Sequence, residues 1–284
     1  MKKIRFLLCC LAIILVGIAC KHPKEIVIIP DIEKNHLQQN HIFGQVREIR
    51  TESFSLKDSN QKIMEDRPLS IMIQHYSSDG FLTEVIKMNP SGDTLSVEKL
   101  HYSADGKVQE RNAFLGNDTI ASGKTIFEYN HYGFKSKETY YMGDSLLWDI
   151  TYKTDDKGNV VEMCVNRNEP LRHKIFYNKV GLLARMEEYE PNGKLFKYVT
   201  IEYDNYGDEV NRRVFKSNDE LIEYTYKQYD QQGRLLKAIY EDRLHDSQEV
   251  SKYDQHDAEG NWLHVINTTN GQPVYGSKRT IQYY

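Results

Sequence analysis

The segment Val199-Thr200-Ile201-Glu202-Tyr203-Asp204-Asn205-Tyr206-Gly207 contains the pattern that decides the fold. Its first five residues alternate between apolar and polar side chains, which is typical of a β-strand with one buried face. The strand reaches a tyrosine, and a glycine follows four residues later. Because glycine readily adopts the positive φ that tight turns require, the segment predicts a strand that runs into a hairpin turn.

This pairing of a tyrosine with a turn glycine recurs about every 25 residues, which indicates an internal repeat. Six pairs have the four-residue spacing, and two longer spacings, Tyr152/Gly158 and Tyr253/Gly260, are interpreted as units with longer turns. A second series of turn signals, such as Pro90-Ser91-Gly92 and Pro191-Asn192-Gly193, falls between them. The repeat tyrosines are Tyr76, Tyr102, Tyr129, Tyr152, Tyr177, Tyr203, Tyr229 and Tyr253, and the turn glycines are Gly80, Gly106, Gly133, Gly158, Gly181, Gly207, Gly233 and Gly260.

Each repeat unit therefore contains two strands and two turns. Residues 44–284 are predicted to form an all-β antiparallel meander of about 16–18 strands, since no segment there shows the 3.6-residue period of a long helix. A twisted sheet of this width normally curls, and its apolar face needs cover. We expect an open shell, a half-pipe or a barrel-like sheet, with the tyrosine face turned inward.

The unit Tyr229-Asp230-Gln231-Gln232-Gly233-Arg234-Leu235 resembles the signature of the YD or RHS repeat family. The Tyr-Asp pair recurs at Tyr203-Asp204 and Tyr253-Asp254, although most units lack the Asp and four of them have Ser or Asn there. The resemblance covers roughly residues 70–284 and implies curled β-sheet shells, some of which enclose a toxin or mediate surface contacts. The chain is far shorter than a complete toxin-enclosing shell, and it ends in the last predicted strand at Ile281-Gln282-Tyr283-Tyr284, which disfavours the toxin interpretation.

The N-terminus is predicted to be a processing signal that comprises residues 1–19. A basic start, Met1-Lys2-Lys3-Ile4-Arg5, precedes a short apolar run and a small-residue cleavage site. Gly17-Ile18-Ala19-Cys20 resembles the bacterial lipoprotein signal, with glycine where a branched apolar residue is commoner. The resemblance implies that Cys20 becomes the acylated first residue of the mature chain. An ordinary secretion signal and an uncleaved anchor remain the alternatives.

The mature chain is predicted to be attached to the outer membrane by its lipid. Lys21 follows the cysteine, and by resemblance to bacterial lipoproteins a residue other than Asp there favours the outer membrane; periplasmic and surface orientations both stay open. Residues 20–43 are interpreted as a tether. Cleavage changes the net charge from −4 to −7 and leaves Cys164 without a disulfide partner once Cys20 is acylated.

Neither catalytic nor metal-binding chemistry is indicated by the sequence. It contains no G-x-S-x-G, H-E-x-x-H, P-loop or paired-cysteine motif, so we predict that the protein is not an enzyme and needs no cofactor. His75, His101 and Glu128 precede successive repeat tyrosines, but the spacing of about 9.6 Å between alternate strands is too wide for a shared metal ion. The segment 155–159, rich in Asp, Gly and Asn, is interpreted as a turn rather than a calcium loop. Cys164 alternates like a core strand residue.

The repeated tyrosines have two interpretations. They either fill the hollow of the curled sheet, which we favour, or form a binding row for a glycan or a protein. Trp148 and Trp262 are likewise expected in the core. With 37 basic and 41 acidic residues, the chain is unsuited to nucleic acid.

The function predicted from the sequence is that of a lipid-anchored, non-enzymatic envelope protein. Its partner would be an envelope or extracellular protein or glycan, bound on the β-sheet surface. The alternative is a structural component whose open sheet edge, at the terminal strand 278–284, pairs with another chain. An enzyme acting on envelope polymers is the least favoured hypothesis.

Overall fold

The computed structural model describes residues 36–39, 42–59 and 62–284 of the chain. It contains a one-turn helix, α1 (His36–Gln39), and 18 strands. No described helix is long and apolar enough to cross a membrane. The strands are β1 (Val46–Ser59), β2 (Lys62–Tyr76), β3 (Leu82–Met88), β4 (Thr94–Tyr102), β5 (Val108–Leu115), β6 (Gly123–Tyr129), β7 (Lys135–Met142), β8 (Ser145–Thr154), β9 (Val160–Asn166), β10 (Leu171–Tyr177), β11 (Leu183–Tyr189), β12 (Leu195–Tyr203), β13 (Glu209–Lys216), β14 (Leu221–Tyr229), β15 (Leu235–Asp242), β16 (Ser247–His256), β17 (Trp262–Thr269) and β18 (Gln272–Tyr283).

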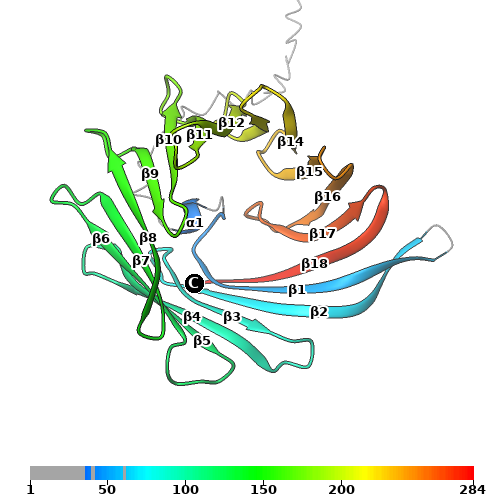
Figure 1. Cartoon of the computed structure of the whole chain (residues 1–284). Coiled ribbons are helices and arrows are strands. Elements are labelled where there is room, and N and C mark those ends of the chain that lie inside the picture. Colours follow the sequence, from blue (N-terminus) through cyan, green and yellow to red (C-terminus); the bar gives the residue numbers. More distant parts are fainter. Residues whose placement is uncertain (1–35, 40–41, 60–61) are drawn as a thin grey trace, which may run out of the picture.

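The sheet closes into a barrel (Figure 1). Each strand pairs antiparallel with its neighbours in the sequence, and β18 pairs antiparallel with β1, with Ile281 opposite Ile49. This confirms the all-β meander and, among the three predicted forms, the barrel. The open edge predicted at residues 278–284 is wrong, because this segment forms hydrogen bonds with β1 in the closed ring.

The repeat glycines lie in hairpin turns at one end of the barrel, here called the helix end, and all of them have positive φ values. In the first of these turns, the Gly80 N–H donates to the Ser77 carbonyl (2.9 Å), and the Ser77 N–H donates to the Phe81 carbonyl (2.8 Å). The Ser77 hydroxyl also accepts the Phe81 N–H (3.1 Å). Ser, Asn or Asp occupies this position in every repeat unit, because each supplies the acceptor oxygen that the turn requires.

The two turns that were predicted to be longer have the same size as the other six. Asp155 and Gly158 form the same pair of backbone hydrogen bonds, so Thr154, not Tyr152, occupies the position that Tyr has elsewhere. In the last unit, His256 occupies that position, since a bulge in β16 inserts a residue between Tyr253 and His256. The longer spacings therefore arise from substitution and a strand bulge, not from the turns.

The barrel is too wide for its side chains to fill. A circular ring of 18 strands, about 4.8 Å apart and tilted by about 40°, would be about 35 Å across, and barrels of 16–18 strands typically enclose an aqueous channel. Accordingly, most strand residues on both faces are only partly buried. We call the enclosed space the lumen.

The best-packed part of the barrel lies around α1, which is inside the ring at the helix end (Figure 1). Leu37 of α1 contacts Val46, Ile49 and Tyr76, and all four side chains are nearly inaccessible to solvent. The Leu37 N–H donates to the Gly80 carbonyl (3.2 Å), which attaches α1 to a repeat turn. The end of the segment predicted as a tether, residues 36–39 and 42–43, therefore belongs to the folded barrel. The predicted signal peptide and the first part of the tether lie outside the described residues.

Candidate functional site

Most repeat tyrosines bind the backbone of the preceding hairpin and have a structural role. Each hydroxyl donates to the carbonyl of the second residue after a turn glycine; for example, the Tyr129 hydroxyl lies 2.7 Å from the Val108 carbonyl oxygen. His256 makes the equivalent contact with Leu235 through Nε2 (2.9 Å). Burial raises the pKa of Tyr129 to about 12. We call this row, which joins neighbouring hairpins at the helix end, the tyrosine ladder: Tyr102, Tyr129, Tyr177, Tyr203 and Tyr229.

The other three repeat tyrosines, Tyr76, Tyr152 and Tyr253, make different contacts from those of the tyrosine ladder. Tyr76 belongs to the core around α1. The Tyr152 hydroxyl donates to Glu138 Oε1 (2.8 Å), and the Tyr140 hydroxyl donates to Glu138 Oε2 (2.6 Å). Burial alone would raise the pKa of Glu138, but its hydrogen bonds with Lys135 and the two tyrosines outweigh burial and lower it. Tyr253 lies beside Trp262, with ring centroids 5.6 Å apart.

The outer wall of the barrel carries ion pairs between neighbouring strands. Glu162 of β9 lies 2.8 Å from the Lys153 ammonium of β8 and 3.0 Å from the Arg172 guanidinium of β10. Hydrogen bonding to Lys153, together with the charge of Arg172, lowers the pKa of Glu162. Similar pairs join β5 to β6 and β12 to β13. These ion pairs place charged side chains on the outer wall of the barrel.

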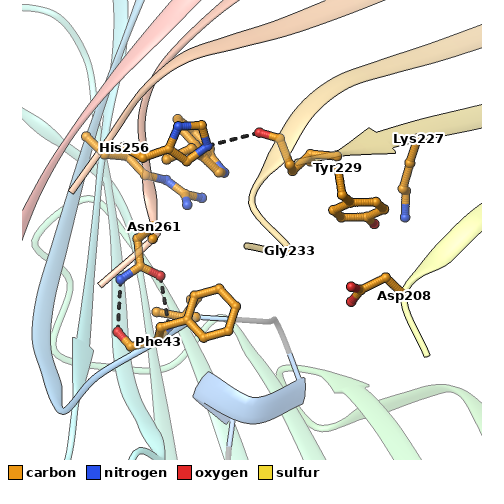
Figure 2. Close-up of a pocket in the computed structure, with 12 residues that line it drawn as sticks. Phe43, Asp208, Lys227, Tyr229, Gly233, His256 and Asn261 are labelled. Atoms are coloured by element: carbon orange, nitrogen blue, oxygen red, sulfur yellow. Dashed lines mark hydrogen bonds between the residues drawn. The ribbon is translucent and has the colours of Figure 1, made fainter. Parts of the chain in front are cut away.

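A cavity of about 210 Å³ lies on the inner wall at the helix end. Figure 2 shows Tyr229, Lys227 and Asp208 on one side of it and His256, Asn261 and Phe43 on the other. The Phe43 N–H donates to Asn261 Oδ1 (2.8 Å), and Asn261 Nδ2 donates to the Phe43 carbonyl (2.9 Å). This pair of hydrogen bonds fixes the chain after α1 across the cavity.

Arg279 is the distinctive residue of this cavity. Its guanidinium lies 3.5 Å from the centre of the Trp262 ring, and its Nε is buried without a hydrogen-bond partner. Burial lowers the pKa of Arg279 to about 10, despite the opposing influence of Tyr76 and Tyr253, so the side chain stays charged at neutral pH. Among the described residues, no carboxylate forms an ion pair with it.

A second cavity, of about 220 Å³, lies toward the opposite end of the barrel, here called the far end. The rings of Tyr140 and Trp148 stack there with centroids 5.0 Å apart and an angle of 28°. The Trp148 side chain is 37% exposed. Glu98 and Arg111 line the same cavity and supply polar groups beside the aromatic pair.

The remaining sequence candidates lie on the outer wall or in turns. His75 binds Glu84 (3.0 Å), and no group of three or more metal-ligating side chains occurs in residues 36–39, 42–59 and 62–284. In the segment 155–159, Asp155 Oδ1 accepts the Asn159 N–H (2.9 Å), as in the other turns. Cys164 is half-buried on the outer wall. These positions converge on no site in the described part of the chain.

Sequence reasoning missed the two cavities and placed both tryptophans in the core. Trp148 is partly exposed to the lumen, and Trp262 contacts Arg279. The available signal was the alternation in β18, which puts Arg279 on the same face as the apolar Ile281. Arg111 also faces the lumen, so an inward register position alone does not single out Arg279, and its lack of a partner is not visible in the sequence.

No family model matches this chain, and no curated protein matches it. Among solved structures, it is similar to a porin-like protein from Bacteroides uniformis, with a TM-score of 0.45 and 13% identity over 84% of this chain and 98% of that chain. A porin-like protein from Bacteroides vulgatus gives 0.32 and 10% over 84% and 98%. A structure described as TcdB2-TccC3-Cdc42 gives 0.33 and 12%, with coverage of 80% of this chain and 16% of that chain. These values describe distant resemblances in shape and assign no family.

Proposed function

We propose that the protein is a lipid-anchored, non-enzymatic envelope protein that binds a glycan inside its barrel. The closed barrel has an outer and an inner surface, and the inner surface is the better candidate. The outer wall pairs its charges strand by strand, whereas the lumen contains two cavities with aromatic side chains.

The observation that carries the proposal is the stacked pair of Tyr140 and Trp148. A partly exposed indole offers a flat apolar face, and sugar rings stack on such faces while neighbouring polar groups bind the hydroxyls. Arg111 and Glu98 are suitably close in the same cavity. The wide lumen leaves room for an extended ligand to reach the pair.

The lipid anchor is proposed from the sequence, since Cys20 lies outside the described residues. Its support is the resemblance of residues 17–20 to a lipoprotein signal. The charged outer wall is compatible with attachment by a lipid rather than insertion of the barrel. Mass spectrometry of the mature N-terminus tests this proposal, and an unmodified Cys20 would contradict it.

The binding proposal is tested by probing the mature protein against a glycan array, followed by titration of the best glycan. We expect Trp148→Ala to weaken this binding at least tenfold, because it removes the stacking face. Phe196→Ala is the matched control, since Phe196 is an exposed aromatic residue that lines neither cavity. Equal loss in both variants, or no glycan bound by the parent protein, would refute the luminal glycan site.

A further inference from the structure

We infer that the cavity at the helix end is a binding site for a carboxylate group, with Arg279 as its central residue. This site is separate from the Tyr140–Trp148 pair and does not depend on the proposed glycan site. The argument rests on the charge, the unused hydrogen-bonding atoms and the size of the cavity.

The first support is an uncompensated charge. Arg279 is partly buried and its Nε is fully buried; burying a guanidinium is costly unless an anion or several acceptors compensate for it. Arg279 has the Trp262 ring on one face and the tyrosines Tyr76 and Tyr253 nearby, but no described carboxylate pairs with it. A ligand with a negative charge would compensate for the positive charge of Arg279.

The second support is a pair of unused polar atoms that lie on neighbouring strands. Arg279 of β18 is directly opposite Thr51 of β1 in the closing strand pair. Both Arg279 Nε and Thr51 Oγ1 are buried and lack a hydrogen-bond partner. Because nearly all buried polar groups in proteins are satisfied, two such atoms on directly paired residues indicate a missing binding partner; of the two residues, Arg279 lines the cavity. Each of them can donate a hydrogen bond to an oxyanion.

The other charges around the cavity favour a single negative charge on the ligand. The Lys227 ammonium lies 3.2 Å from Glu209, a carboxylate that it shares with the Arg212 guanidinium (2.7 Å), so one further carboxylate balances these two cations. Asp208 adds a negative charge to the lining. Among the described lining residues, Arg279 is therefore the cation left to neutralise a ligand, which suits a carboxylate better than a doubly charged phosphate.

The size and the apolar lining narrow the ligand further. A volume of about 210 Å³ is below the range typical of drug-sized ligand pockets and suits one sugar-sized unit. Trp262, Ile42 and Phe43 supply apolar surface beside the charge. A free sugar acid and an acidic sugar within a polymer present this same chemistry.

The experiment uses the fluorescence of Trp262 as a local probe. The chain has two tryptophans, so Trp148→Phe leaves Trp262 as the sole reporter, in contact with Arg279. This variant is titrated with glucuronate, with glucose as the uncharged match, and with inorganic phosphate. We expect a saturable change with glucuronate, none with glucose and weaker binding of phosphate.

Two further substitutions separate the site from a general charge effect. Arg279→Met in the same background should weaken glucuronate binding at least tenfold, whereas Arg213→Met, which removes an outer-wall arginine, should leave it within twofold. Circular dichroism and thermal melting verify folding. If Arg279→Met does not fold, Arg279→Lys keeps the charge, lacks the bidentate fork and should bind more weakly than the parent.

Several outcomes would overturn the inference. They are equal binding of glucose, unchanged affinity in a folded Arg279→Met protein, tighter binding of phosphate than of glucuronate, or no saturable response to either glucuronate or an oligoglucuronide. An oligoglucuronide tested in parallel distinguishes the two sources of the carboxylate. Binding of the monomer points to a free sugar acid, whereas binding of the oligomer alone points to an acidic sugar within a polymer. Loss of glycan binding through Trp148 would leave this site unaffected.

Discussion

The helix end and the far end of the barrel are built from the same strands but differ in how their hairpins are held. At the helix end, the tyrosine ladder joins neighbouring hairpins, and α1 packs on a small core. At the far end, large apolar side chains are 54–82% exposed; examples are Leu95, Leu115, Ile120, Met142 and Leu146. This difference indicates that the Tyr–Gly repeat motif stabilises the barrel at the helix end.

The largest expected effect comes from the core around α1. Ile49→Ala should lower the free energy of unfolding by about 2–5 kcal/mol, because Ile49 is fully buried against Leu37 and Tyr76. Leu115→Ala at the far end is the control and should change it by less than about 0.5 kcal/mol, since Leu115 is 60% exposed. Urea unfolding of both variants measures the contrast, and equal losses would remove it.

A smaller effect is expected when turn glycines at the two ends are compared. Gly158 has a φ of +86°, and a Cβ there would lie 2.5 Å from the Phe134 ring. Gly193, at the far end, has a φ of +82° and open space around it. Gly193→Ala should cost about 1 kcal/mol from backbone strain alone, and Gly158→Ala about 2–3 kcal/mol because crowding is added. Thermal unfolding tests this order, and a reversed order would contradict it.

The smallest expected effect is that of one ladder hydrogen bond. Tyr129→Phe should cost about 1 kcal/mol, whereas Tyr132→Phe, which alters a 70% exposed residue in the adjacent turn, should cost almost nothing. Both values come from chemical denaturation near pH 7.

The pH dependence gives a second measurement of the same bond. Burial raises the pKa of Tyr129 to about 12 in the folded state, above its ordinary value of about 10. The folded state therefore retains the phenolic proton more strongly than the unfolded state. The stabilisation is fully present below about pH 10 and is lost as the pH rises toward 12. A difference between parent and Tyr129→Phe that stayed constant to pH 12 would contradict this account.

Local features of the fold were predictable because they depend on short-range chemistry. The Tyr–Gly pairs predicted the hairpins and nearly the full number of strands, since a positive-φ glycine and an alternating strand are encoded within about ten residues. The prediction that Tyr152 and Tyr253 are equivalent to the other repeat tyrosines was wrong, because this equivalence depends on how the strands pair and not on short-range chemistry. A bulge, or a substitution such as Thr154, changes the spacing, and only the paired strand reveals which residue takes the ladder position.

The sequence by itself determined that the chain is a repeated antiparallel meander with its tyrosines on one face. Closure required the tertiary structure, because β1 and β18 pair across more than 200 residues and no local pattern specifies that contact. Closure also created the inferred site, since it places Thr51 opposite Arg279, and Thr51 Oγ1 and Arg279 Nε are buried there without hydrogen-bond partners. A sequence reveals which groups carry charge, but only the folded chain shows which of those charges is left uncompensated.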